Sequence, residues 1–319
     1  MKNIKFNLLK TISKTLHSNK IRNHKILFLN IFLICFLSLG IQNSQSKENQ
    51  SLMWKVEYTP DKTYTYILGS IHIGRKDMYP LKNFIEKAYK NSESLVLEID
   101  MNKVNPMDLM KLMTYQNENT LKSKLEPDTY NKLSKVFVDN NLPEVIFNKF
   151  KPWAAILTAQ QLTMKDLLTD DIAPGIDLYF LDKANKDKKQ VEELETAEFQ
   201  MSLFDDFDSI ANDYIDYSLA QLDNNNELEE LMTSYINSDI DGLDKIINKT
   251  KGEFLEYDKI LEKILYERNI QMYNKISNWL KSDRKIRFIV VGAGHLVGDK
   301  SIISEFEKDS NYKITNVID

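Results

Sequence analysis

Short apolar runs bounded by turn-forming residues mark the strands that this sequence predicts. Residues 53–59 and 63–70 form two such runs, and the Pro-Asp-Lys between them favours a turn. Four further runs of the same character lie at residues 94–100, 188–195, 285–292 and 312–318. The pattern therefore predicts strands spread along the chain from about residue 51 to its end.

Between these runs, apolar residues recur at intervals of three and four positions, which predicts helices. Single helices are expected at residues 81–91, 175–186 and 299–308. Two longer stretches, at about 105–170 and 197–281, are expected to form a large helical insertion. Strands that alternate with helices indicate an α/β fold, here a central mixed β-sheet flanked by helices and carrying this insertion.

The first 46 residues differ in kind from the rest. Residues 1–25 carry seven Lys or Arg and no acidic residue, and residues 26–41 are almost continuously apolar. A basic segment, a short apolar segment and small residues before the cleavage point are typical of a secretory signal peptide. Since the apolar run is shorter than the ~20 residues of most spanning helices, cleavage near Ser46 is favoured over an N-terminal membrane anchor.

Export is therefore expected, to a periplasmic, extracellular or membrane-anchored location, with residues 26–41 as the possible tether and residues 47–319 as one α/β domain. Seven of the 42 Lys and Arg precede residue 26, which leaves 35 against 47 Asp and Glu, a charge of −12. This balance argues against nucleic acid or an anionic membrane surface as a partner. Cys35, the only cysteine, lies in the apolar run, so the domain needs no disulfide.

Both histidines that follow residue 46 occur in the same local pattern. His72 ends Tyr-Ile-Leu-Gly-Ser-Ile-His and His295 ends Ile-Val-Val-Gly-Ala-Gly-His, so each follows an apolar strand, a glycine and two further residues. Ligands of α/β proteins gather beyond the carboxyl ends of strands, and Gly69 and Gly292 would let each backbone turn off its strand there. The repeated pattern predicts one site that contains both histidines.

The glycines near His295 do not form a nucleotide-binding loop. Gly292, Gly294 and Gly298 have the spacing G-x-G-x-x-x-G, which departs from the dinucleotide fingerprint, and only 21 residues follow Gly298. That length is too short for a crossover helix, a second strand and a ribose-binding acid.

Acidic residues stand at two other strand ends. Glu98 and Asp100 occur in Leu-Val-Leu-Glu-Ile-Asp, and Glu193 and Glu195 in Val-Glu-Glu-Leu-Glu. Glu98 follows three apolar residues, an unusual place for a charge unless it reaches a polar pocket, whereas Glu195 could equally belong to a helix start. Two histidines with carboxylates suit a catalytic divalent metal that keeps an open position, and this mixed nitrogen and oxygen set does not distinguish manganese, cobalt and zinc.

Segments in a common order along the chain resemble the TraB/PrgY/GumN family, which also includes the Wnt-inactivating Tiki proteases. Gly-Ser-Ile-His and Gly-Ala-Gly-His-Leu-Val-Gly are similar to the family's two GxxH motifs, and Leu-Val-Leu-Glu-Ile-Asp to its acidic strand end. The other matching segments are a Lys-Pro-Trp helix, a long signature and an Arg-Asn helix, at residues 151–160, 174–200 and 264–276.

The resemblance implies the α/β core shared by Tiki, the haem-uptake ChaN proteins and erythromycin esterases. It also implies a site of six residues in which the two histidines face each other: His72, Glu98, Glu195, Arg268, Asn269 and His295. Asp177 fits the long signature too, although an acidic residue at a helix start explains it equally well. By the same resemblance, manganese or cobalt is favoured as the metal, with zinc as the alternative.

The leading hypothesis is an exported, metal-dependent hydrolase that acts on peptides or proteins. His72, His295 and Glu98 would bind the ion, which would activate a water and polarise a carbonyl group. Glu195, if it is not itself a ligand, could accept the proton of that water.

In the same hypothesis, Arg268 and Asn269 would stabilise the developing oxyanion. Two alternatives stay open. One is a metal-independent hydrolase of the erythromycin-esterase type, with a histidine general base and a glutamate. The other is a non-catalytic protein that sequesters a peptide, as pheromone-shutdown proteins do. The sequence determines neither the substrate nor the oligomeric state.

Overall fold

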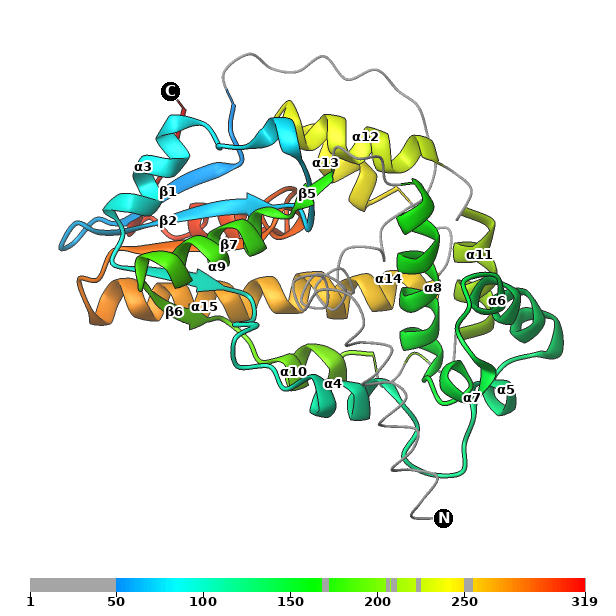
Figure 1. The fold of residues 1–319 in the computed structure, drawn as a ribbon. Coiled ribbons are helices and arrows are strands. Elements are labelled where there is room, and N and C mark those ends of the chain that lie inside the picture. Colours follow the sequence, from blue (N-terminus) through cyan, green and yellow to red (C-terminus); the bar gives the residue numbers. More distant parts are fainter. Residues whose placement is uncertain are drawn as a thin grey trace.

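The computed structural model describes residues 50–167, 172–204, 207, 211–221, 225–249 and 255–318 (Figure 1). The expected signal peptide or anchor, residues 1–46, lies outside the described residues. No helix in the described part of the chain combines the length and the apolar character that a membrane crossing requires.

Six strands form a mixed sheet, and each corresponds to one of the predicted runs. In spatial order they are β6 (Gln190–Glu193), β4 (Ser94–Leu97), β7 (Arg287–Gly292), β2 (Thr63–Ser70), β1 (Met53–Tyr58) and β8 (Tyr312–Asn316). Strands β6, β4, β7 and β2 pair in parallel, whereas β1 pairs antiparallel with both β2 and β8. The four parallel strands therefore end at the same edge of the sheet, and the predicted α/β fold class is confirmed.

Helices cover both faces of this sheet, which explains why its central strands are apolar throughout. Every residue of β4 and β7 is buried, as expected for parallel strands between two helical layers. Helices α3 (Asn83–Asn91) and α9 (Ile176–Asp187) pack on one face, where the ring of Phe288 lies 4.8 Å from Phe180 and 5.8 Å from Tyr89. Figure 1 shows α15 on the opposite side of the strands.

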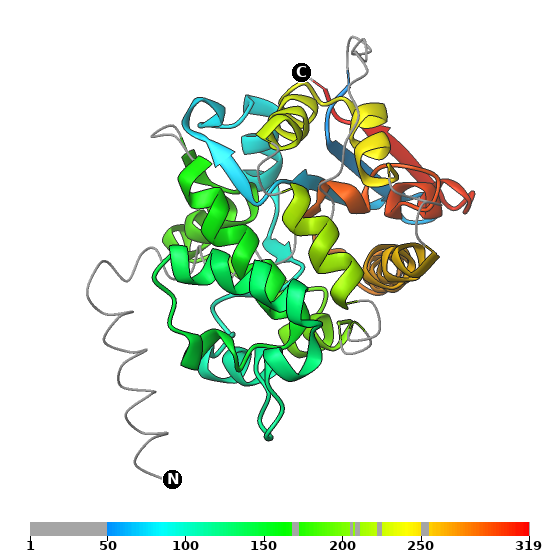
Figure 2. The ribbon, with the colours of Figure 1, turned by 90° about the vertical axis from the view of Figure 1, so that its right-hand side faces the viewer.

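Most of the remaining helices follow β4 or β6 along the chain. Between β4 and β5 lie α4 (Pro106–Met113), α5 (Leu121–Lys124), α6 (Pro127–Asp139), α7 (Glu144–Phe147) and α8 (Pro152–Leu167). Between β6 and β7 lie α10 (Ala197–Ser202), α11 (Ala211–Gln221), α12 (Asn225–Ile236), α13 (Ile240–Ile247), α14 (Leu255–Leu261) and α15 (Glu267–Ser282). Figures 1 and 2 show that α5–α8 and α11 gather beyond the carboxyl ends of the parallel strands.

Two local features did not follow from the apolar pattern. Strands β3 (Ile73–Arg75) and β5 (Ile172–Pro174) form a separate antiparallel pair, and three residues are too few to show the alternation typical of a strand. A π-helical turn, Glu262–Tyr266, joins α14 to α15. Such turns occur frequently at functional sites, and this one directly precedes the predicted Arg-Asn pair.

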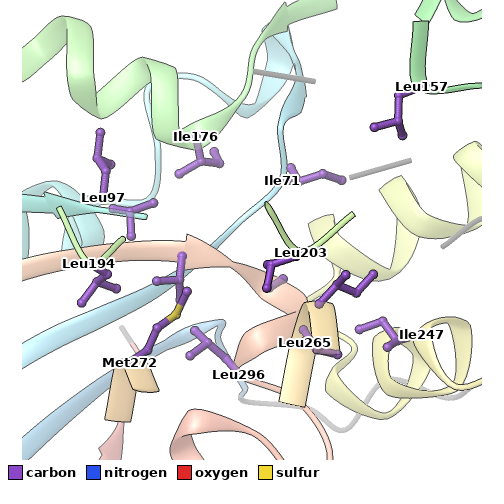
Figure 3. Close-up of a cluster of buried hydrophobic side chains, with 14 of the residues drawn as sticks. Ile71, Leu97, Leu157, Ile176, Leu194, Leu203, Ile247, Leu265, Met272 and Leu296 are labelled. Carbon is purple, nitrogen blue, oxygen red and sulfur yellow. The ribbon is translucent and has the colours of Figure 1, made fainter. Parts of the chain in front are cut away.

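A single hydrophobic core extends from the sheet into the helical insertion. Figure 3 shows the part beside the strand ends, where Leu97 and Leu194 lie near Met272 of α15, and Leu265 lies near Ile247 of α13. Because this packing is continuous, the insertion is fixed relative to the strand ends rather than joined to them through a polar gap.

Candidate active site

The two GxxH segments leave the sheet side by side. Strands β2 and β7 are parallel neighbours, with Ser70 paired to Gly292. The backbone N–H of Gly292 donates to Glu98 Oε1 at 2.7 Å, and a Cβ at this position would lie 3.4 Å from the same oxygen. A Cβ at that distance would make an ordinary van der Waals contact, so this approach does not require glycine. The hydrogen bond brings the ends of β2, β4 and β7 to one point.

His295 is buried and rests on an uncharged partner. Its Nδ1 lies 2.5 Å from Oδ1 of Asn269, whose Nδ2 in turn donates to the carbonyl of Lys300 at 2.8 Å. Because the amide oxygen can only accept, we assign the ring proton to Nδ1, which leaves Nε2 with its lone pair. Burial lowers the pKa of His295 to about 3, although Glu98 partly opposes this shift. His295 is therefore neutral at physiological pH.

His72 rests on a charged partner instead. Its Nδ1 lies 3.0 Å from Oδ1 of Asp177, in the first turn of α9. Burial alone would lower the pKa of His72, but the charge and hydrogen bond of Asp177, together with Glu98, outweigh it and raise the pKa. The start of α9 is held tightly here, since a Cβ on Gly175 would come within 2.4 Å of the His72 backbone. Only glycine fits this approach.

Glu98 stands between the two histidines. Its Oε2 accepts from Arg268 at 2.6 Å and from Gln200 at 3.2 Å, and its Oε1 lies 3.6 Å from His295 Nε2. Burial would raise the pKa of Glu98, but His295, Arg268 and His72, with the Gly292 N–H, lower it to about 2. The carboxylate is therefore ionised at any physiological pH.

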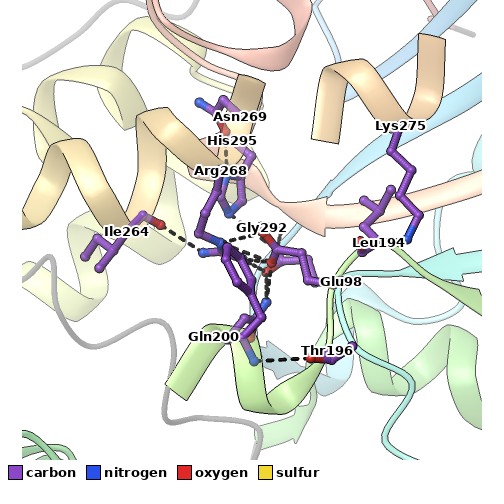
Figure 4. Close-up of polar contacts among 12 residues, drawn as sticks. Glu98, Leu194, Thr196, Gln200, Ile264, Arg268, Asn269, Lys275, Gly292 and His295 are labelled. Carbon is purple, nitrogen blue, oxygen red and sulfur yellow. Dashed lines mark hydrogen bonds and ion pairs between the residues drawn. The ribbon is translucent and has the colours of Figure 1, made fainter. Parts of the chain in front are cut away.

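A buried arginine connects this carboxylate to a second one (Figure 4). Arg268 donates through Nε to Glu195 Oε1 at 3.0 Å and through Nη2 to Glu195 Oε2 at 2.7 Å. Its Nη1 donates to the carbonyl of Ile264, in the π-helical turn, at 2.9 Å. Gln200 donates to Glu195 Oε2 at 2.7 Å, so one planar guanidinium and one amide hold both carboxylates in place.

The structure brings together all six residues that the sequence and the resemblance indicated, but in two layers. His72, Glu98, Arg268 and His295 line one cavity. Glu195 and Asn269 stand behind them and position Arg268 and His295, respectively.

This arrangement changes two expected roles. The carboxylate of Glu195 is engaged by Arg268 and Gln200, so it is not placed to accept a proton from water. The oxyanion role expected of Asn269 is likewise replaced by a positioning role, because its amide bonds His295 and the Lys300 carbonyl and its side chain is buried.

Two other candidate acids do not enter the site. Glu193 accepts from Lys103 at 3.1 Å and from the backbone N–H of Asp100 at 3.2 Å. Neither the Glu193 nor the Asp100 side chain lines the cavity that contains the two histidines. The helix-start explanation of Glu195 is also wrong, since Thr196 caps α10 through its hydroxyl, which accepts from the Phe199 N–H.

Two further residues, Gln200 and Asp177, contact the site residues. Gln200 touches both Glu98 and Glu195, and its only signal was its place at the end of the long signature segment. Asp177, which fits both the signature and a helix start, lies in the first turn of α9, and one of its oxygens also bonds His72. Its Oδ2 is buried without a partner among the described residues.

The imidazole nitrogens and the carboxylate at this site are groups that commonly bind divalent ions. His72 and His295 each use Nδ1 for an oxygen of a supporting side chain, as metal-binding histidines do, which directs Nε2 to another partner. His295 Nε2 and Glu98 Oε1 lie 3.6 Å apart, so the two atoms could serve as ligands of one ion. Within the described part of the chain, however, no three His, Cys, Asp or Glu side chains are already grouped as a metal site.

Comparison with known proteins identifies the family of the chain. The model of the TraB/PrgY/gumN family matches residues 52–316. The chain belongs to this family. It is 25% identical over 247 residues to the uncharacterized protein YbaP of Shigella flexneri and of Escherichia coli K12, an alignment that covers 76% of this chain and 88% of YbaP.

A more distant family relative carries an activity in its name. The chain is 22% identical over 322 aligned residues to metalloprotease TIKI1 of Danio rerio, which covers 84% of this chain and 63% of TIKI1. No solved structure matches the chain significantly. Family membership and this distant similarity point to a hydrolase.

Proposed function

We propose that the protein is an exported hydrolase of peptide bonds that depends on a divalent metal. The observation that carries the proposal is the shared arrangement of His72 and His295. Each ring is held through Nδ1 by a buried oxygen, and both line the cavity that contains the ionised Glu98. The similarity to metalloprotease TIKI1 supports the same reaction class.

His72, His295 and Glu98 would hold the ion, with manganese or cobalt favoured over zinc. When bound, such an ion lowers the pKa of a water and polarises a carbonyl group. The low pKa values of His295 and Glu98 suit this role, because protons would not compete with a cation for these groups at neutral pH.

Arg268 would serve the reaction in two ways. Its bonds to Glu98 and Glu195 hold both carboxylates in place, and its charge helps to lower the pKa of Glu98. Arg268 also lines the cavity, so its positive charge would favour an oxyanion formed there.

A second candidate is a hydrolase that uses no metal. It is favoured by one observation, the His72–Asp177 pair, in which a buried carboxylate raises the pKa of the imidazole. His72 could then accept the proton of an attacking water, as a histidine oriented by an acid does in other hydrolases. The two candidates differ in whether His72 binds a metal or a proton.

The experiment that separates them is hydrolysis of a quenched peptide library after chelation. We expect chelation to abolish turnover and added Mn²⁺ or Co²⁺ to restore it, and Glu98→Gln to be inactive with any metal. Glu193→Gln is the matched control, because this glutamate lies at a neighbouring strand end but outside the cavity. Full activity in chelator would favour the metal-free hydrolase, and peptide binding without turnover would favour sequestration.

The proposed location has its own test. We expect cell fractionation to recover the protein outside the cytoplasm, with N-terminal sequencing beginning near residue 47. A protein found in the cytoplasm with an intact N-terminus would contradict export. A protein retained in the membrane with an intact N-terminus would mean that residues 26–41 act as an anchor.

A further inference from the structure

Two cavities meet at the proposed reacting centre. One, here called the α9 pocket, is walled by apolar side chains from α9, α4, α10 and the segment after β4. They include Met101, Val104, Leu109, Leu178, Leu181 and Met201.

The other cavity, here called the α13 pocket, is walled by side chains from α12, α13 and the π-helical turn. Its apolar side chains include Leu231, Tyr235, Leu243, Ile246, Ile247 and Leu265. Ser70, His72 and Glu98 line both pockets, so the proposed chemistry lies at their junction.

The shape of this junction fits an extended peptide. Successive side chains of an extended chain point in opposite directions, so the residues on the two sides of one peptide bond could enter the two pockets while the bond lies beside His72 and Glu98. A single acyl chain would need only one of the pockets. The pairing of two apolar pockets around one centre therefore favours a peptide.

The charges of the walls indicate where in the peptide the bond lies. Among the described residues that line the two pockets, Arg268 is the only Lys or Arg, and it is bound to Glu98 and Glu195. Apart from the proposed ion at the junction, a terminal carboxylate of a substrate would therefore meet no cation on the walls that is not already engaged by two carboxylates. The walls suit a bond inside a chain rather than at its carboxyl end.

We propose that the protein cleaves peptide bonds between two apolar residues away from the carboxyl end of a chain, with one residue held in the α9 pocket and the other in the α13 pocket. The inference rests on the proposed peptidase function and names its substrate class. Water supplies a hydroxyl to the carbonyl carbon and a proton to the amine as the C–N bond breaks. Each product then carries one of the two apolar residues at its new terminus.

Leu178 and Leu231 offer a matched test, because each lines one pocket and each is only partly buried. The full chain is incubated with a library of peptides of natural sequence, and the new termini are read by mass spectrometry. We expect apolar residues on both sides of the cleaved bond. Leu178→Arg should replace the apolar preference by an acidic one on one side, and Leu231→Arg on the other, each by roughly 10-fold or more.

Milder variants and a surface control guard against misfolding. Leu178→Ala and Leu231→Ala should weaken the preference on the same sides by roughly 10-fold. Ile270→Arg changes an exposed apolar residue of α15 outside both pockets and should leave the cleavage pattern unchanged. Turnover without an apolar preference, or two arginine variants that alter the same side, would overturn the proposal while leaving the peptidase function intact.

A binding measurement separates failure of the pockets from failure of the peptidase function. The probe is a labelled peptide in which a reduced CH₂–NH bond joins two leucines, and its affinity is followed by fluorescence anisotropy. Both arginine variants should weaken binding by roughly 10-fold or more. If wild type cleaves no peptide but binding behaves in this way, the peptidase function falls and the two subsites stand. Hydrolysis of p-nitrophenyl octanoate that depends on Leu178 alone, without peptide cleavage, would overturn the proposal in favour of an acyl ester.

Discussion

The two GxxH histidines share a motif and a strand-end position, but the side chains that support them differ in charge. His72 rests on the carboxylate of Asp177, and His295 on the amide of Asn269, through the same ring nitrogen. The pKa of His72 is raised and that of His295 is lowered to about 3. An identical sequence pattern thus holds one imidazole that can bind a proton and one that stays neutral.

The difference shows that electrostatics, rather than the motif, assigns the histidine roles. A neutral, buried imidazole with a directed Nε2 suits metal binding and is a poor base. An imidazole beside a carboxylate is a better donor to a cation and also a better proton acceptor. The His72 side is therefore where the metal-dependent and metal-free hypotheses diverge.

Removing Arg268 should have the largest effect on both the stability and the activity of the protein. Arg268→Met leaves Glu98 and Glu195 buried without their cation, which should lower the free energy of unfolding by about 3–5 kcal/mol and abolish activity. Urea unfolding of the variant beside Arg268→Lys, which keeps the charge, measures the loss. A loss below about 1 kcal/mol would mean that the buried carboxylates do not depend on this guanidinium.

Exchanging the carboxylate and the amide that support the two histidines should bring the pKa values of the histidines closer together. Asp177→Asn should lower the pKa of His72, and Asn269→Asp should raise that of His295, because a carboxylate at hydrogen-bond distance favours the imidazolium. NMR titration of the ring protons in the metal-free protein reads both values. If neither pKa moves, the contrast does not originate in these side chains.

Acidification should change the contributions of the two histidines to the free energy of unfolding in opposite directions. For His295, the folded pKa of about 3 lies below the unfolded value of 6.5. Its contribution is therefore complete above pH 6.5 and is lost as the pH falls towards 3. Between pH 7 and 5 this loss should be about 2 kcal/mol in the metal-free protein.

The opposite sign applies to His72, whose folded pKa is raised. Its contribution is present below pH 6.5 and is lost as the pH rises through the folded value. Urea unfolding in chelator should therefore show a smaller loss on acidification for His295→Gln than for wild type, and a larger loss for His72→Gln. Two variants with the same pH slope would contradict the assigned difference.

The smallest effect is expected at the neighbouring strand end. Glu193→Gln removes a partly exposed charge that pairs with Lys103, so the free energy of unfolding should change by less than about 1 kcal/mol and metal affinity should not change. A larger effect on metal affinity would extend the site beyond the two pockets.

Much of this arrangement was accessible from the sequence. Apolar runs predicted all six strands of the main sheet, and parallel strand ends must share an edge, so the repeated GxxH pattern was enough to bring His72 and His295 together. The Arg268–Asn269 pair came only from family resemblance, because an Arg-Asn pair in a helix has no distinctive pattern of its own.

Other features depend on contacts between distant segments. Gln200 reaches Glu98 from 102 residues away, and the Asp177–His72 bond spans 105 residues. No periodicity signals such contacts. The exchange of roles at Asn269 and Glu195 likewise depends on which polar atoms their side chains meet in the folded chain, a property that residue type does not determine.

The most direct test of the central claim is a metal titration of wild type beside His295→Gln. Calorimetry with Mn²⁺ or Co²⁺, checked by elemental analysis, should give one ion per wild-type chain and an affinity at least about 100-fold weaker in the variant. Asn269→Ala, which removes only the support of His295, should fall between them, with a loss of about 10–100-fold. Equal stoichiometry and affinity in wild type and His295→Gln would contradict a metal site built on the two GxxH histidines.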